Sequence, residues 1–132
     1  MKTNIALLIE QSVNVIDSLN KGLRLTHKEQ QFFCEHFERE EIKKNEFTIR
    51  IGDYEKYLYF IESGILRYWT AQEYGDPDKE VTFWFSFPGE FANSYFSLKE
   101  NQPSLIHIQA LTDCVIWKLS KQDLADLYQT SL

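Results

Sequence analysis

The chain has 132 residues, of which 43% are hydrophobic and 15% aromatic, a composition that supports one folded domain and excludes an intrinsically disordered chain. Fourteen lysines and arginines stand against twenty aspartates and glutamates, so the net charge is −6. This sign disfavours contact with nucleic-acid phosphates, and we expect the chain itself not to bind DNA. Two cysteines, Cys34 and Cys114, are too few for a disulfide framework.

The N-terminal segment has neither the apolar core of a signal peptide nor the length of a membrane span. Its apolar run between Ile5 and Ile9 ends at Glu10, whereas a bilayer requires about 20 consecutive apolar residues. With the two cysteines interpreted as reduced thiols, we expect a cytoplasmic protein that makes no membrane contact.

Helical periodicity at the start of the chain predicts two N-terminal helices. Between residues 4 and 19, apolar side chains recur every three or four positions, as they do on one face of a helix. Thr26 and Glu29 then form a capping-box pattern, which opens a second helix that carries Phe37 near its end. We therefore predict that both helices lie within residues 4–37.

From Ile42 onward the hydrophobic period changes to two, which is typical of strands. Turn residues divide this region into about eight short strands, with candidate turns at 52–53, 64, 74–78 and 112–113. Ser120 is a candidate N-cap for a short C-terminal helix over residues 120–129. We predict a single α+β domain, residues 1–132, built on an antiparallel β-roll of the double-stranded jelly-roll type over residues 42–119.

Three segments of the predicted roll carry a family resemblance. Residues 57–67, YLYFIESGILR, are two apolar strands hinged at Gly64. This segment resembles the glycine-hinged strands of the cyclic-nucleotide-binding domain, as found at the front of Crp/Fnr-type transcription regulators. Residues 88–91, PGEF, are similar to the G-[DE]-F of that family, and residues 108–120 are similar to its closing strands.

The resemblance implies a ligand site in the segment that follows Phe91. In the family, a Gly-Glu pair in this segment grips a ribose hydroxyl through its Glu, and a later Arg pairs with the cyclic phosphate. A gapless count from Phe91 to Ala110 places Ser94 at the Glu position and Ser104 at the Arg position, so both charged anchors are missing. The candidate ligand-binding residues are Phe91, Asn93, Ser94, Tyr95, Ser104 and Leu105.

Two other interpretations of this segment stay open. A shifted register places Gly89-Glu90 on the Gly-Glu of the family, but it lengthens the following loop and still leaves Ser104 where the Arg belongs. Alternatively, residues 93–102 are an ordinary polar connection between strands, although their hydroxyls, amides and free helical N–H groups also suit an anion.

Two further side chains on the predicted strands have a functional and a structural interpretation. Arg67 is the cation best placed to replace the missing Arg, but it alternates with Leu66 and Tyr68 and is expected to point outward, with its stem along Trp69 or Ile65. Trp84 lies on the less apolar face of its strand, where it marks either a protein interface or a partly covered aromatic.

Metal and catalytic chemistry find no support in the sequence pattern. His107 stands alone between two isoleucines, whereas a metal-dependent cupin needs two neighbouring histidines and a glutamate. Cys34 and His36 diverge on a predicted helix, and two cysteines are too few for the iron–sulfur cluster of an Fnr-type sensor. The acidic residues within 73–80 lack the order of a calcium loop. We expect no catalytic residues, no metal and no cofactor.

These observations together predict a non-enzymatic sensor domain with a degenerate phosphate-binding cassette. The resemblance implies an unidentified small-molecule ligand, contact with DNA only through a region absent from this chain, and compatibility with a homodimer. The family continues into a long helix and a helix-turn-helix, whereas this sequence stops at Leu132. We therefore expect either the sensor part of a longer regulator or a free-standing module. The alternative function is a protein-interaction module on a ligand-free jelly roll.

Overall fold

The computed structural model describes residues 35–72, 75–76 and 78–131. The predicted N-terminal helices fall almost entirely outside these described residues, as do Tyr74 and Pro77 of the predicted turn at 74–78.

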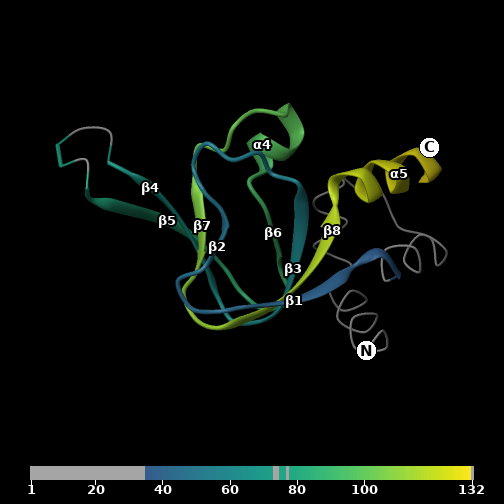
Figure 1. Cartoon of the computed structure of the whole chain (residues 1–132), viewed down its shortest axis with the longest axis horizontal. Helices are drawn as coiled ribbons and strands as arrows, with labels where there is room; N and C mark the ends of the chain where they lie inside the picture. Colours follow the sequence, from purple (N-terminus) through teal and green to yellow (C-terminus); the bar gives the residue numbers. More distant parts are fainter. Residues whose placement is uncertain (1–34, 73–74, 77, 132) are drawn as a thin grey trace.

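Two four-stranded antiparallel sheets form the described part of the chain (Figure 1). One sheet has the order β1-β8-β3-β6 and the other the order β2-β7-β4-β5. The strands are β1 (Glu38–Ile42), β2 (Phe47–Ile49), β3 (Tyr57–Ser63), β4 (Leu66–Ala71), β5 (Glu80–Ser86), β6 (Phe91–Ala92), β7 (His107–Ala110) and β8 (Cys114–Ser120). The predicted antiparallel roll is confirmed, although its first strand begins at Glu38 rather than Ile42.

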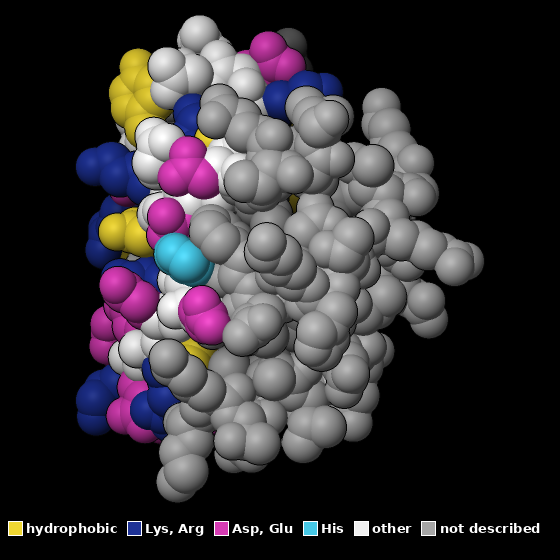
Figure 2. Space-filling model, turned by 90° about the vertical axis from the view of Figure 1, so that its right-hand side faces the viewer, with side chains coloured by type: hydrophobic (Ala, Val, Ile, Leu, Met, Phe, Trp, Pro, Cys, Tyr) yellow, Lys and Arg dark blue, Asp and Glu magenta, His cyan; other side chains and the backbone are white. Residues whose placement is uncertain are grey.

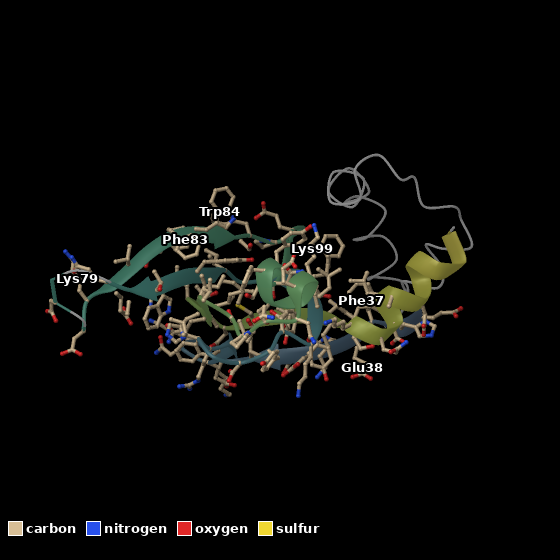
Figure 3. The ribbon with its side chains drawn as sticks, turned by 90° about the horizontal axis from the view of Figure 1, so that it is seen from above. Phe37, Glu38, Lys79, Phe83, Trp84 and Lys99 are labelled. Carbon is tan, nitrogen blue, oxygen red and sulfur yellow. The ribbon has the colours of Figure 1, made fainter. Side chains whose placement is uncertain are left out.

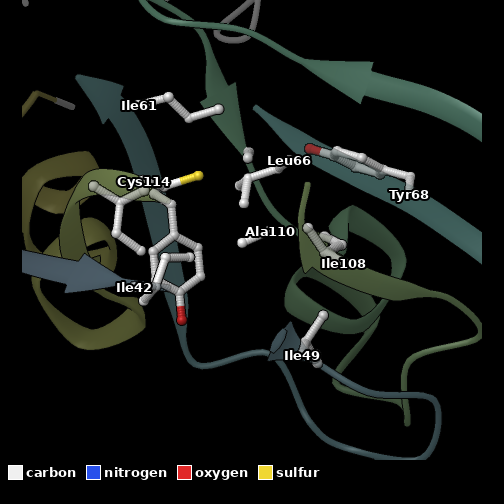
Figure 4. Packing of buried hydrophobic residues seen from close by; sticks show 11 residues of the cluster. Ile42, Ile49, Ile61, Leu66, Tyr68, Ile108, Ala110 and Cys114 are labelled. Carbon is white, nitrogen blue, oxygen red and sulfur yellow. The ribbon is translucent and has the colours of Figure 1, made fainter. Parts of the chain in front are cut away.

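Apolar side chains of both sheets fill the space between them. Figure 4 shows Ile61 of β3 coming together with Leu66 of β4 and Ile108 of β7. All three side chains are fully buried. The complete cluster is Ile42, Ile49, Tyr59, Ile61, Leu66, Tyr68, Ala92, Ile108, Ala110, Cys114 and Ile116. The period-two alternation of the sequence therefore specifies the inner face of most strands.

The C-terminal helix starts where the sequence predicts it. The hydroxyl of Ser120 accepts a hydrogen bond from the backbone N–H of Asp123 at 3.1 Å, which is the geometry of an N-cap. The helix, α5 (Lys121–Ser131), extends slightly beyond the predicted end at residue 129. It packs against β8 and β3. Within the described part of the chain, no helix has the length and apolar character that crossing a bilayer requires.

Strand β5 departs from the alternation that its sequence suggests. Tyr68 of β4 pairs with Trp84, but the next residue, Trp69, pairs with Thr82, so Phe83 is an extra residue in a β-bulge. After the bulge the small Ser86 is buried while Phe85 is exposed. The apolar odd positions of this strand therefore do not form a core face.

Candidate functional site

Residues 93–105, between β6 and β7, hold five of the six candidate ligand residues, all except Phe91 of β6, and are called the cassette below. It contains one short helix, α4 (Tyr95–Glu100), which lies at one end of the roll (Figure 1). The cassette is fastened to the loop between β2 and β3 by two backbone hydrogen bonds. The N–H of Gly52 donates to the carbonyl of Ser104 at 2.9 Å, and the N–H of Ser104 donates to the carbonyl of Asp53 at 2.7 Å.

The two serines at the expected anchor positions contact one another. Their hydroxyl oxygens are 2.8 Å apart, and both residues are buried. The hydroxyl of Ser104 also donates to the carbonyl of Ile106 at 2.8 Å. Because a hydroxyl has a single proton, Ser94 donates and Ser104 accepts in the bond between them. The positions that the gapless register assigns to Glu and Arg thus face each other across the cassette.

A third polar group, Glu55 from the loop before β3, completes this buried cluster. Its carboxylate accepts hydrogen bonds from the backbone N–H of Ser94 at 2.9 Å and of Tyr57 at 3.4 Å. Its own N–H donates to the hydroxyl of Ser97 at 2.8 Å. Glu55 is only 4% exposed, and this burial raises the pKa of its carboxyl group from 4.5 to about 7. The cassette therefore encloses a carboxylate of the chain itself.

Sequence reasoning missed Glu55 as a site residue. It stands between Tyr54 and Lys56 in a polar loop, where a carboxylate is ordinarily solvated. Nothing in the local pattern marks it, because its burial arises from the cassette, some forty residues further along the chain. The backbone pairing of this loop with Ser104, together with the bonds of Glu55 to Ser94 and Ser97, brings the two segments together.

A second set of hydrogen bonds connects the start of the cassette to β4 and β5. The hydroxyl of Ser86 donates to that of Tyr68 at 2.9 Å, and the backbone of Asn93 hydrogen-bonds to the same phenol oxygen. Burial raises the pKa of Tyr68. Asn93 is therefore fixed through its backbone to β4 and Ser94 to the loop before β3, which limits the freedom of the cassette to rearrange.

The remaining predicted site residues point elsewhere. Tyr95 and Leu105 are exposed. Phe91 packs its ring against Phe60 at a centroid distance of 5.1 Å, on the side of the sheet opposite to the inward-facing Tyr59. The structure therefore brings Ser94 and Ser104 together but does not gather all six candidates around one cavity.

Arg67 does not reach the cassette. Its guanidinium group donates to Gln109 at 2.9 Å and to Thr82 at 3.3 Å. It also forms an ion pair with Glu80 at 3.2 Å and lies 5.0 Å from the ring centre of Trp69. This agrees with the predicted outward orientation. Among the described residues, the other ion pairs join Arg39 to Glu41 and Lys118 to Glu40, so none supplies a cation to Glu55.

The charges around the site are predominantly acidic. An open cavity of about 390 Å³ lies beside Glu55 and has two carboxylates, from Asp53 and Glu55, but only one lysine, Lys56, in its wall. On the part of the face in Figure 2 that the described residues form, acidic and basic side chains are interspersed. An anionic ligand would find little electrostatic attraction here.

The family model for the cyclic nucleotide-binding domain matches residues 39–131. The chain belongs to this family. The match covers every described strand after the first residue of β1 and all of α5, and it confirms the resemblance that residues 57–67 and 88–91 carry.

Solved structures with the same fold include transcription regulators and kinase subunits. The Thermus thermophilus catabolite activator protein superposes with a TM-score of 0.69 at 23% identity, over 80% of this chain and 48% of its own. For the c-di-GMP responsive regulator CLP of Xanthomonas campestris, the TM-score is 0.67 at 25% identity, over 81% of this chain and 50% of that one. A regulatory subunit of a cAMP-independent protein kinase A from Trypanosoma cruzi, bound to guanosine, superposes with a TM-score of 0.74 at 18% identity. The superposition covers 93% of this chain and 41% of that one.

This cyclic nucleotide-binding domain spans half or less of the length of these three structures. No curated protein sequence matches it significantly. Within the part of the chain that the structure describes, no group of three or more His, Cys, Asp or Glu side chains is arranged to hold a metal ion.

Proposed function

We propose that this domain is a non-enzymatic ligand-sensing module of a Crp/Fnr-type regulator, with a cassette unsuited to cyclic phosphates. The observation that carries the proposal is the buried bond between Ser94 and Ser104, closed by the carboxylate of Glu55. A cyclic phosphate requires a cation at this place, and the cassette presents two hydroxyls and a carboxyl group.

The expected loss of affinity follows from the missing anchors. A hydrogen bond to a charged group contributes roughly 1.5–3 kcal/mol net, and a bidentate Arg–phosphate pair lies toward the upper end of this range. Two absent anchors correspond to about 3–6 kcal/mol, or roughly a hundredfold to ten-thousandfold in dissociation constant. Ionised Glu55 adds repulsion of the phosphate to this deficit.

An uncharged ligand suits the cluster better. A hydroxyl or amide of such a ligand can exchange hydrogen bonds with Ser94, Ser104 or the carboxyl group of Glu55 without bringing a second negative charge. The structural neighbour from Trypanosoma cruzi, bound to guanosine, supports this proposal because guanosine carries no phosphate.

The described contacts also suggest how occupancy would reach the C-terminal helix. The first N–H of α5, from Lys121, donates to the carbonyl of Lys56 at 2.8 Å, next to Glu55. The ammonium group of Lys121 donates to Asn101, at the end of α4, at 3.4 Å. A ligand that binds more tightly to one arrangement of these segments would raise the population of that arrangement and so change the position of α5. The size of this population shift is set by the difference between the ligand affinities of the two arrangements. We propose that a DNA-binding region outside residues 1–132 receives this shift.

Calorimetric titration of the full chain with cyclic AMP and with adenosine tests the proposal. The two ligands share their base and ribose but differ in the phosphate. We expect cyclic AMP to bind at least a hundredfold more weakly than to a family domain with both anchors, and adenosine to bind no more weakly than cyclic AMP. Micromolar or tighter binding of cyclic AMP would overturn the proposal.

A pair of double variants isolates the role of charge. Ser94→Glu with Ser104→Arg supplies both anchors in the gapless register, and it should strengthen cyclic AMP binding. Ser94→Gln with Ser104→Met introduces side chains of similar size without charge and should leave binding weak. Equal affinities for the two double variants would exclude the gapless register.

One observation favours the alternative function, a protein-interaction module. Strand β5 leaves four large aromatic side chains at or next to it exposed, namely Phe83, Trp84, Phe85 and Phe87. These four aromatic side chains take no part in the hydrogen bonds of Ser94 and Ser104, so an interaction there is compatible with ligand sensing.

A further inference from the structure

A cavity of about 390 Å³ is lined by β2, β3 and the loop that joins them. Its wall contains no residue of the cassette, 93–105. Glu55 and Tyr59 in this wall are buried, whereas Asp53 and Lys56 are exposed, so the first two line the inner end of the cavity and the other two its mouth. A cavity of this size accommodates a small organic molecule, held by a few well-placed polar contacts.

Tyr59 brings a buried hydroxyl group without a hydrogen-bond partner to the cavity. The residue is 6% exposed, and none of the described residues forms a hydrogen bond with its hydroxyl group. Burial and, to a lesser extent, the charge of Glu55 raise the pKa of this phenol, so it keeps its proton at neutral pH. Buried polar groups in folded proteins nearly always have a partner. The unpaired hydroxyl group therefore points to a partner that enters the cavity.

The carboxylate of Glu55, at the same inner end, has no cationic partner among the described residues. Its hydrogen bonds come from backbone N–H groups, while Lys118 pairs with Glu40 at 3.3 Å. Figure 3 shows Lys79 at the far end of the β4–β5 hairpin and Lys99 on α4, and neither lies in the cavity wall. A buried carboxylate without a counter-charge favours a positively charged ligand.

We propose that this cavity binds a small organic ammonium compound, whose nitrogen donates hydrogen bonds to the hydroxyl oxygen of Tyr59 and to the carboxylate of Glu55. The wall also holds the aromatic rings of Tyr54 and Tyr57, and ammonium groups are attracted to the faces of such rings. Tyr57 already shows this chemistry, because the ammonium group of Lys118 lies 4.7 Å from its ring centre. The site goes beyond the proposed ligand sensing, since its wall excludes the cassette.

The composition of the wall favours an organic cation over other ligands. It has two carboxylates, from Asp53 and Glu55, and one lysine, Lys56, which disfavours anions. A bare metal ion fits poorly, because the described residues contain no group of three or more His, Cys, Asp or Glu side chains that could hold one. Burial raises the pKa of Glu55 to about 7, and an ammonium group beside this carboxyl group favours its ionised form.

Calorimetric titration of the full chain with 2-phenylethylamine and with 2-phenylethanol tests the proposal. The two compounds have the same ring and chain length, but only the amine carries a positive charge. At about pH 8 the carboxyl group of Glu55 is ionised, and the amine, whose pKa is about 10 like that of lysine, is protonated. We expect the amine to bind at least tenfold more tightly than the alcohol.

Two single variants identify the groups that hold the ammonium. Glu55→Gln removes the charge and Tyr59→Phe removes the hydroxyl group, and each should weaken binding of the amine at least threefold. Tyr59→Phe should keep the fold, because its hydroxyl group forms no hydrogen bond with the described residues. The matched controls are Glu80→Gln and Tyr95→Phe, which make the same changes outside the cavity wall and should bind the amine as the wild type does.

Circular dichroism confirms that each variant is folded before affinities are compared, and Tyr59→Phe decides alone if Glu55→Gln does not fold. Equal affinities for the amine and the alcohol would overturn the proposal. So would the absence of binding at millimolar concentrations, which would mean that water alone fills the cavity. A preference for the amine that a folded Glu55→Gln or Tyr59→Phe variant leaves unchanged would also overturn it. None of these results bears on the cassette, which the titrations with cyclic AMP and adenosine test separately.

Discussion

β3 and β5 have the same length and a similar richness in aromatic and aliphatic residues, yet their environments are opposite. β3 lies between β8 and β6, and four consecutive residues, Leu58 to Ile61, are buried. In β5, which has one neighbouring strand, only Ser86 is buried. Burial is therefore decided by the position of a strand in the sheet and by what covers its faces, more than by its composition.

The largest difference between the two strands should appear on truncating a phenylalanine in each. Phe60 of β3 is fully buried against Phe91, and Phe60→Ala should lower the free energy of unfolding by about 3–5 kcal/mol, as expected for a buried phenylalanine. Phe85→Ala in the exposed strand should cost less than about 1 kcal/mol. Urea unfolding of the two variants under identical conditions measures both losses.

This pair of variants also checks the burial of β5 itself. A loss for Phe85→Ala as large as that for Phe60→Ala would mean that Phe85 is covered in the monomer, contrary to its exposure.

The next effect arises at the start of β3, where Glu55 is buried. Its pKa is raised from 4.5 to about 7 by burial, so the native state holds the proton more tightly than the unfolded chain does. Stability should therefore fall as the pH rises from about 4.5 through 7. The shift corresponds to roughly 3 kcal/mol. Glu55→Gln should remove this loss, because its amide is uncharged and its oxygen can still accept the N–H of Ser94.

Urea unfolding of both proteins across this pH range gives the difference directly. The two free energies of unfolding should be similar below about pH 4.5, diverge between about pH 4.5 and 7, and differ by a constant amount above that range, with the Gln variant more stable. Glu80→Gln is the matched control on β5, since it removes an exposed carboxylate, and it should retain the wild-type loss. Parallel profiles for wild type and Glu55→Gln would show that Glu55 does not titrate in this range.

Most of the fold was predictable because alternation and turn residues are local signals. The strands β2 to β5, β7 and β8, the turn at Gly64 and the N-cap at Ser120 follow from them and are confirmed. The two strands joined at Gly64 lie in different sheets, and the two-residue strand β6 was not predicted. The sequence did not reveal β5 as an exposed edge. Its odd positions are apolar, which suggests a core face, but the bulge at Phe83 disrupts that face, and β4 is the one strand that pairs with β5 among the described residues.

The site was predictable to a lesser extent. Counting along the family pattern identified Ser94 and Ser104 as positions that belong together, and the structure places their hydroxyls 2.8 Å apart. Counting could not reveal Glu55 or the bond between Tyr68 and Ser86, because these groups reach the cassette from distant segments. That the six candidate residues bind a ligand stays a prediction.

The smallest effect distinguishes two glycines that share a backbone conformation. Gly64, between β3 and β4, has φ +90°, and Gly52, between β2 and β3, has φ +95°. Alanine in this left-handed region costs about 1–2 kcal/mol at either position. The surroundings differ, because a Cβ atom at residue 64 would lie 2.5 Å from the carbonyl oxygen of Asp113 and 2.5 Å from the Sγ of Cys114, whereas one at residue 52 would meet nothing within 4 Å.

Gly64→Ala should therefore destabilise the domain by about 1–3 kcal/mol more than Gly52→Ala, which is the usual cost of overpacking. The carbonyl of Asp113 and the Cα of Cys114 are backbone groups, so the clash is relieved only by moving the start of β8 away from β3. Urea unfolding of the two variants under identical conditions measures the difference. Equal losses would mean that the β3–β4 turn and β8 can separate freely, which would contradict the close packing that sets β3 apart from β5.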